Sequence, residues 1–270
     1  MDCLILCPFW IQIVSNERII EELKKIMQMG KLHQAIELIK DVGLLQYVLP
    51  EVNVLSETQQ SPKHHSEGDV YQHTLGVLRN APATIHGQLA ALLHDIGKPQ
   101  TAQVLKEEIV FHGHEEVGSE IARAILQRLK LDTPTIDKVV KMVRHHMQPH
   151  FLIHQDSGNK ALRRFIRNVG DDLIDDILDL AEADALGSWP VTNYIPELRG
   201  KIKAIQSAPV KPTNKPVLNG NEIAEILSIK PGKLIGEVGK YLLDIQDDYA
   251  ESNKELTKEE AKKLILEKFK

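Results

Sequence analysis

The sequence has few cysteines and few aromatic residues. Of its 270 residues only Cys3 and Cys7 are cysteines, and aromatic residues make up 4%. Two cysteines exclude a small secreted fold held together by disulfides, and they favour a reducing, cytoplasmic location. A low aromatic content, with many Leu, Ile, Ala, Lys and Glu residues, is typical of a helical protein.

The chain also lacks a large charge excess and a long hydrophobic run. Its net charge is −5, so no global basic field attracts nucleic acid and any RNA contact must be local. The segment Met1–Val14 is apolar, but it carries Asp2 instead of a basic start. It is also shorter than the about 20 residues that span a bilayer. We expect a packing strand or edge segment here, and no membrane association.

Apolar residues recur at helical spacing along most of the chain. Helices are predicted over residues 17–29, 32–40, 70–80, 85–96, 115–130, 135–146, 159–169, 171–186, 219–227, 231–250 and 257–270. The stretch from Gln100 to Phe111 suits a short hairpin, and the polar stretch 53–67 suits a linker. The sequence therefore predicts an all-α fold with at most one small β-hairpin.

What the chain does have is a concentration of histidine. Eleven of its twelve histidines lie between His64 and His154. The adjacent His94 and Asp95 end an apolar run, just before Gly97 and Pro99. Burying either polar group costs a few kcal/mol unless it is paired. A metal ion is the simplest partner that satisfies both.

Other ligand-type residues interrupt or flank predicted apolar helices: His73, His112, His114, His145, His146 and Asp184. Imidazoles and carboxylates without thiolates suit Mn, Fe, Ni, Zn or Mg, among which the residues do not choose. Ligands from five segments exceed the needs of one tetrahedral ion. Two divalent cations about 3.5–4 Å apart, bridged by Asp95, would use them all. A histidine at a helix end is more often a cap or surface residue, which is the interpretation for His33, His64, His65, His86, His150 and His154.

The order His73, His94-Asp95, Asp184 resembles the HD superfamily of metal-dependent phosphohydrolases, which implies an all-helical bundle. Gly113-His114-Glu115 and Arg144-His145-His146 resemble the subgroup with two additional histidines and a two-metal site. That resemblance favours His146 over His145 as a ligand. The implied metal ligands are His73, His94, Asp95, His114, His146 and Asp184.

A narrower resemblance, to bacterial CCA tRNA nucleotidyltransferases, covers residues 15 to 270. It rests on Ser15–Ile26 with Val42–Glu51, on the His-Asp-Ile-Gly-Lys-Pro segment, and on Val217–Ile223 with Lys230-Pro231-Gly232. It implies a neck-like helical region resembling an RNA-binding domain (1–60), an HD metal-binding domain (61–190) and a helical tail domain (191–270). In that family a nucleotidyltransferase head precedes the helical region. Because the match begins at about residue 15, we expect no room for such a head. We therefore do not expect CCA addition.

The resemblance implies hydrolysis of a nucleotide or RNA-end phosphate ester. The cations would lower the pKa of a bridging water held by Asp95, the catalytic carboxylate. Lys98 and Arg144 are placed to neutralise phosphate oxygens, with Lys98 as a plain charge at a helix carboxyl end as the alternative. His145 would contact substrate.

Arg163, Arg164 and Arg167 would form either a solvated face or a substrate-binding basic face. The alternative function is a non-catalytic body that binds tRNA or another RNA, with a structural or vestigial metal site. The oligomeric state is left open.

Overall fold

The computed structural model describes residues 14–60, 68–106, 108–154, 158–188 and 193–270. The chain forms two compact units. Unit 1 comprises Met1–Pro149 and Asp175–Ile195, and unit 2 comprises His150–Ile174 and Pro196–Lys270. Apart from Val14, the predicted edge segment lies outside the described residues, together with both cysteines.

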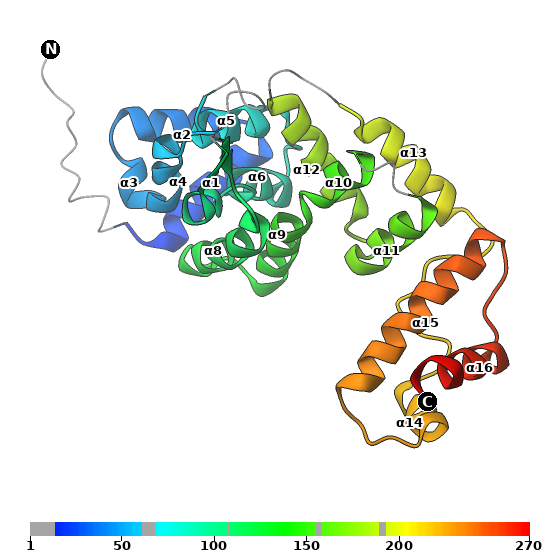
Figure 1. Ribbon diagram of the computed structural model, residues 1–270. Coiled ribbons are helices and arrows are strands. Elements are labelled where there is room, and N and C mark those ends of the chain that lie inside the picture. The colour runs from blue at the N-terminus through cyan, green and yellow to red at the C-terminus, as the bar shows by residue number, and fades with distance from the viewer. Residues whose placement is uncertain (1–13, 61–67, 107, 155–157, 189–192) are drawn as a thin grey trace, which may run out of the picture. The chain divides into compact units, whose positions relative to one another are not determined.

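Helices make up nearly all of the regular structure (Figure 1). The described residues contain one two-stranded antiparallel sheet, in which β1 (Gln103–Leu105) pairs with β2 (Glu108–Val110). It lies inside the stretch predicted to form a hairpin. The all-α prediction is therefore confirmed.

Unit 1 begins with four helices: α1 (Asn16–Gln28), α2 (Leu32–Asp41), α3 (Leu45–Val48) and α4 (Pro50–Val54). A single 3-10 turn, Leu55–Glu57, follows. The prediction of a linker over residues 53–67 was therefore wrong at its start, and residues 61–67 lie outside the described part. The remaining helices of the unit are α5 (Val70–Asn80), α6 (Ile85–Leu93), α7 (Lys98–Thr101), α8 (His114–Arg128), α9 (Thr133–His145) and α12 (Ile174–Gly187).

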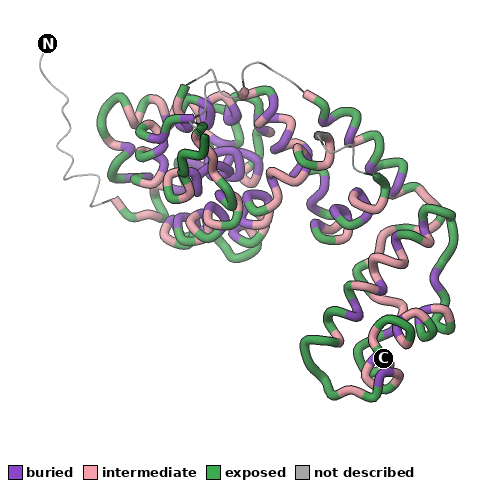
Figure 2. The backbone as a smooth tube through the Cα atoms, in the orientation of Figure 1, coloured by how far each residue is buried: buried purple, intermediate pink, exposed green. Residues whose placement is uncertain are grey.

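Helix α6 is the centre of the core of unit 1. Every residue from Gly87 to Leu93 is buried, and α6 packs against α1, α5 and α9. Buried backbone gathers around it in Figure 2. The helix ends at Leu93, earlier than the predicted residue 96, and α7 starts anew at Lys98 with Pro99 in its first turn. The polar pair His94-Asp95 therefore lies at a buried helix end.

Unit 2 contains α11 (Asn159–Val169), α13 (Ile195–Gln206), α14 (Gly220–Leu227), α15 (Lys233–Glu251) and α16 (Lys258–Phe269). The short α10 (Gln148–His154) crosses the boundary between the units. A hydrophobic core of unit 2 joins α14, α15 and α16. Its buried residues include Leu218, Ile223, Leu227, Val238, Leu242 and Ile265. Helix α13 was not among the predicted helices. It contains Pro196, which is only the second residue of the helix, where proline is tolerated.

The two units do not follow the three predicted regions. Residues of the first two regions share unit 1, whereas residues 150–174 join the carboxyl-terminal part of the chain in unit 2. The three-region division describes sequence resemblance and stays a prediction. Among the described residues, no helix has the length and hydropathy needed to cross a membrane.

Candidate metal centre

The six predicted ligands come together in unit 1: His73, His94, Asp95, His114, His146 and Asp184. Three of them mark helix ends. His94 and His146 directly follow α6 and α9, and His114 is the first residue of α8. The side chain of Asp184, on α12, is 13% exposed, and the other five residues are each at most 6% exposed. The centre is therefore largely shielded from bulk water.

One half of the centre is built from α5, α6 and α12. His73 Nε2 lies 3.0 Å from Asp184 Oδ1, 3.2 Å from His94 Nε2 and 3.6 Å from Asp95 Oδ2. His94 Nε2 is also 3.1 Å from Asp95 Oδ2. His73, His94 and Asp95 form one group whose ligand atoms are close enough to share a cation.

The other half uses the second oxygen of the same aspartate. Asp95 Oδ1 lies 3.3 Å from His114 Nε2 and 3.9 Å from His146 Nε2. The two histidine Nε2 atoms are 3.3 Å apart. Asp95, His114 and His146 form a second group that could hold a cation. Each carboxylate oxygen of Asp95 therefore faces a different group.

Backbone carbonyls fix the orientation of three of these imidazoles. Each Nδ1 lies 2.7–2.9 Å from the carbonyl oxygen three residues earlier, which pairs His94 with Ala91, His114 with Phe111 and His146 with Val143. An Nδ1–H donating to a carbonyl leaves the Nε2 lone pair facing the centre, as in metal-binding histidines. The local fold therefore presents Nε2 as the ligand atom.

The arrangement fits a cation between facing imidazoles. With both Nδ1 atoms engaged, His114 and His146 point Nε2 lone pairs at each other across 3.3 Å. Without a proton or a cation between them, such lone pairs repel. A cation bound at about 2.0–2.1 Å from both nitrogens would separate them by roughly 3 Å, which matches the observed spacing.

The protonation states also suit cation binding. Burial alone would raise the pKa of the Asp95 carboxyl, but the charges of His94 and Lys98, with the hydrogen bonds that His114 and His94 donate when Nε2 is protonated instead of metal-bound, hold it well below its usual range. Burial lowers the pKa of His146 to about 3, and the neighbouring His94 and His114 add to this shift. Burial would lower the pKa of His114, but its hydrogen bond to Asp95 and the Asp95 charge raise it. Asp95 is therefore ionised and His146 neutral, the forms in which they bind metals.

Lys98 lies directly beside the shared carboxylate. Its buried Nζ is 2.7 Å from Asp95 Oδ2 and donates a 2.6 Å hydrogen bond to Gln60 Oε1. Lys98 is the first residue of the four-residue α7, whose single turn also places it near the carboxyl end, so the alternative of a charge at a helix carboxyl end stays a prediction. Gln60 was missed, since it lies in a polar stretch without periodicity and no sequence signal points to it.

Arg144 and His145, two of the predicted substrate contacts, lie outside the six-residue cluster. Arg144 is 52% exposed along its side chain and donates to Glu116 Oε1 at 2.6 Å. His145 is half-buried and is not among the groups that could hold a cation. Burial lowers the pKa of His145. The structure thus separates the two adjacent histidines, with His146 inside the centre.

The three arginines predicted to form a basic face belong to unit 2 and are paired within it. Arg164 pairs with Asp244 at 2.9 Å, and Arg167 pairs with Asp247 at 2.6 Å. Arg163 is 4% exposed and donates to the Val210 carbonyl. Arg163 is buried and the Arg167 side chain is 8% exposed where α11 meets α15 and the loop after α13. The prediction of a solvated face is therefore corrected for these two residues, and a substrate-binding face stays a prediction.

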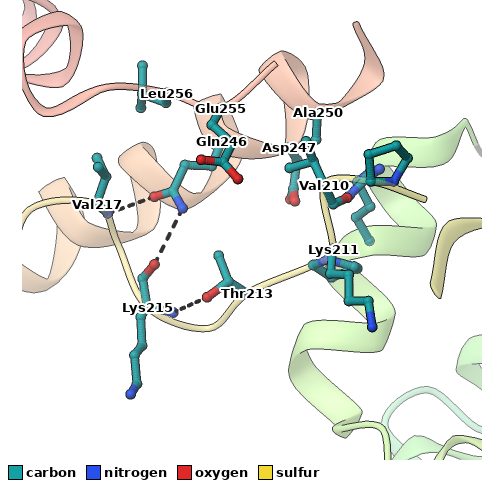
Figure 3. A pocket seen from close by; sticks show the side chains of 13 residues that line it. Val210, Lys211, Thr213, Lys215, Val217, Gln246, Asp247, Ala250, Glu255 and Leu256 are labelled. Carbon is teal, nitrogen blue, oxygen red and sulfur yellow. Dashed lines mark hydrogen bonds between the residues drawn. The ribbon is translucent and has the colours of Figure 1, made fainter. Parts of the chain in front are cut away.

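Arg163 also lines a pocket of about 520 Å³ in unit 2. One wall is the loop from Pro209 to Val217, and the other comes from the end of α15 and from Glu255 and Leu256 (Figure 3). Gln246 fastens the loop, accepting from Val217 N and donating to the Lys215 carbonyl. In Figure 3 the Lys211 and Lys215 ammonium groups point away from the side chains of Gln246 and Asp247. The pocket is therefore lined mainly by the loop backbone, by acceptor groups and by apolar side chains.

Two family models match the chain. Residues 70–188 match the HD domain, which contains all six residues of the centre. Residues 6–55 match the family described as "Probable RNA and SrmB- binding site of polymerase A". HD domains bind divalent metals, and the two groups around Asp95 are suited to that role.

Curated relatives extend the similarity over most of the chain. The chain is 32% identical to the CC-adding tRNA nucleotidyltransferase of Thermus thermophilus, over 93% of this chain and 56% of that protein. It is 28% identical to the A-adding tRNA nucleotidyltransferase of Deinococcus radiodurans, over 84% of this chain and 54% of that protein. It is 31% identical to the multifunctional CCA protein of Halorhodospira halophila, over 77% of this chain and 52% of that protein. The chain spans about half the length of these relatives. The chain therefore carries a segment that matches the HD domain, and it is similar over most of its length to tRNA nucleotidyltransferases.

Proposed function

We propose that this protein is a metal-dependent phosphohydrolase that cleaves a phosphate ester of a nucleotide or of an RNA end. The observation that carries the proposal is the shared aspartate. Asp95 presents one oxygen to His73 and His94 and the other to His114 and His146. A carboxylate between two groups of ligands is suited to a pair of divalent cations.

In this proposal His73, His94, Asp95 and Asp184 would hold one cation, and Asp95, His114 and His146 would hold the other. Such cations lower the pKa of a bound water and neutralise phosphate oxygens when they are present. Mn, Fe, Ni, Mg and Zn all remain compatible with these nitrogen and oxygen ligands. The carbonyl partners of the imidazoles keep their Nε2 atoms aimed inward, so little reorganisation accompanies binding.

Lys98 supplies a fixed positive charge in the same place. Its ammonium is held by Asp95 and Gln60, and we propose that it donates to a phosphate oxygen of the substrate. Arg144 and His145, beside His146 in the sequence, are proposed to contact the substrate farther from the centre. Because the relatives act on tRNA, as their names state, an RNA end in the cytoplasm is the favoured substrate.

Metal content and hydrolysis test this proposal together. Wild-type protein dialysed after Mn²⁺ loading should retain two ions per chain by elemental analysis. Asp95→Asn should lose both ions and all hydrolysis, since it removes the shared ligand. His146→Ala should retain one ion and lose hydrolysis. The substrates would include a generic phosphodiester, nucleoside 2′,3′-cyclic phosphates and 3′-phosphorylated oligoribonucleotides.

The matched control is His145→Ala, one residue away from a proposed ligand. It should retain both ions, although its turnover of RNA substrates is expected to fall. Wild-type protein that carries two ions and hydrolyses none of these substrates would overturn the phosphohydrolase proposal. Equal ion loss in His145→Ala and His146→Ala would overturn the ligand assignment.

A second candidate function is RNA binding without catalysis. It is favoured by the match of residues 6–55 to an RNA-binding family. In this case the protein binds tRNA with an affinity that falls steeply with salt, because phosphate contacts release counterions. Binding would be the same for wild type and Asp95→Asn. A gel-shift series between 25 and 200 mM salt tests it, and no tRNA shift at the lowest salt would remove it.

A further inference from the structure

Three proposed ligands are each followed by a glycine one helical turn later. Gly76 follows His73 on α5, Gly187 follows Asp184 on α12, and Gly118 follows His114 on α8. Residues three or four apart lie on the same face of a helix. Glycine weakens a helix relative to alanine, so its repeated presence beside the ligands requires a reason in the packing.

The first reason is a contact between α5 and α12. A Cβ at Gly76 would lie 2.8 Å from the carbonyl oxygen of Gly187, and a Cβ at Gly187 would lie 2.6 Å from the backbone nitrogen of Val77. Both separations are too short for any side chain. The two helices therefore touch backbone to backbone, one turn away from the 3.0 Å contact between His73 and Asp184.

The second contact joins the start of α7 to α8. A Cβ at Gly97 would collide with the carbonyl oxygen of His114 and would lie 2.6 Å from Gly118 N. A Cβ at Gly118 would lie 3.2 Å from Gly97 N, a milder conflict. Gly97 is two residues after Asp95, so this contact lies beside the 3.3 Å approach of Asp95 Oδ1 to His114 Nε2.

We infer that these two glycine contacts position the two cation sites separately. The Gly76–Gly187 contact sets the site of His73, His94 and Asp184, and the Gly97–Gly118 contact sets the site of His114 and His146. The inference rests on the proposed two-cation centre. The glycines are positioning residues, because they act through the spacing of the ligands and touch neither cation nor substrate.

A larger side chain at one of these glycine positions is expected to weaken cation binding at one site and not at the other. Each contact joins a different pair of ligand-bearing segments, so widening one lengthens ligand separations in one site only. Cation sites tolerate errors of only a few tenths of an ångström in ligand distance. Residues behind a ligand commonly change metal affinity by about 10–100-fold, and a similar loss is expected at the affected site.

The experiment isolates each site first and then alters each contact. In His146→Ala protein, where only the first site is complete, Gly187→Ala should raise the Mn²⁺ dissociation constant at least tenfold and Gly118→Ala less than twofold. In Asp184→Ala protein, where only the second site is complete, Gly118→Ala should raise the Mn²⁺ dissociation constant more than Gly187→Ala does. Isothermal titration gives affinity and stoichiometry in each case, without measurement of hydrolysis.

Two controls separate positioning from general damage. Gly200→Ala and Gly236→Ala, on α13 and α15, add a Cβ that meets nothing within 4 Å, and they should leave Mn²⁺ affinity unchanged. Circular dichroism in EDTA confirms that each variant is folded. Gly76→Ala repeats the Gly187→Ala test from the other side of the first contact. Gly97→Ala, which creates the more severe conflict, repeats the Gly118→Ala test from the other side of the second contact if that variant folds.

The outcomes separate the inference from the function on which it rests. Two ions on wild type with equal weakening of both sites by Gly187→Ala would overturn the inference and leave the proposed function standing. Unchanged Mn²⁺ affinity in every glycine variant would also overturn the inference and leave the proposed function standing. A wild-type chain that binds no Mn²⁺ would overturn both.

Discussion

Lys98 is a buried, charged residue beside the carboxylate that the two proposed cation sites share. Its ammonium is 2.7 Å from Asp95 and 2.6 Å from Gln60. Because it competes with a cation for an Asp95 oxygen, it is expected to serve the substrate and not metal binding. Lys98→Met should retain both Mn²⁺ ions while kcat for a phosphodiester falls about 100-fold or more, as for loss of a charge-stabilising donor.

Elemental analysis and steady-state kinetics on the same preparations provide the measurement. Gln60→Leu is the companion variant, since it leaves the ammonium in place and removes only one of its partners. It should lose less activity than Lys98→Met. Loss of bound Mn²⁺ with unchanged turnover per ion would contradict this role for Lys98.

The sequence predicted the side chains of the centre better than their partners. The pair His94-Asp95 is visible because two polar residues interrupt a buried apolar run. Choosing His146 over His145 required a family resemblance, since both follow the same helix pattern. Gln60 and the partners of Arg163 come from distant segments, so only tertiary structure reveals them.

Among the elements, α11 and α15 are joined by ion pairs of different burial. The Arg167–Asp247 pair is 8% and 5% exposed, whereas the Lys160–Asp248 pair is 36% and 45% exposed. Arg167→Ala should lower the free energy of unfolding by about 3 kcal/mol, because it leaves a buried carboxylate unpaired. Lys160→Ala should cost under about 1 kcal/mol. Urea unfolding measures both.

The double variant Arg167→Met with Asp247→Leu tests the reason for that difference. Replacing a buried ion pair by apolar side chains is often neutral, so the double variant should be more stable than Arg167→Ala. Burial already raises the pKa of Asp247, against the effect of Arg167. A double variant as unstable as the single one would contradict an electrostatic origin of the loss.

Two helices of unit 2 begin with reciprocal caps that respond to pH. Asn219 with Glu222 starts α14, and Thr257 with Glu260 starts α16. The hydrogen bond from Lys258 lowers the pKa of Glu222, and the hydrogen bond from Thr257 lowers the pKa of Glu260, both from 4.5. A carboxyl with a depressed folded-state pKa contributes stability above its unfolded value, and this is lost as pH falls through the folded pKa.

Unit 2 should therefore lose stability as the pH falls below about 4.5. Replacing both residues, with Glu222→Gln and Glu260→Gln, should flatten this dependence while glutamine retains part of each cap. Urea midpoints between pH 3 and 6 give the comparison. Parallel pH profiles for wild type and the double variant would rule out the caps as its source.

Helix prediction succeeded where periodicity is long and failed where proline or shortness obscured it. Helix α5 spans the predicted residues 70–80, because its N-cap Asp69 and its apolar face are both local signals. The short α3, α4 and α7 hold too few turns to show a period. Their positions depend on packing with neighbouring helices.

At the scale of the whole molecule, the candidate metal centre lies within unit 1. A ligand that binds only the folded form stabilises it by about 2.7 kcal/mol at 100 times its dissociation constant. Mn²⁺ should therefore raise the unfolding midpoint of unit 1 by roughly 5–10 °C. The unit 2 transition should not move.

Differential scanning calorimetry with and without Mn²⁺ measures this effect. Asp95→Asn should abolish the shift, and Arg167→Ala should lower the other transition without changing the response to Mn²⁺. A single transition that moves as a whole with Mn²⁺ in wild-type protein would show that the units unfold as one and would contradict this prediction.

The helix ends around the centre have a consequence of their own. Both α6 and α9 terminate there, at His94 and His146, and α8 begins there at His114. A helix carries about half an elementary negative charge at its carboxyl end and the opposite at its amino end. The carboxyl ends of α6 and α9 bring partial negative charge to this point, and the amino ends of α8 and of the short α7 bring partial positive charge. These charges belong to the backbone, so no side-chain substitution deletes them, and even a chain stripped of its ligands keeps them here.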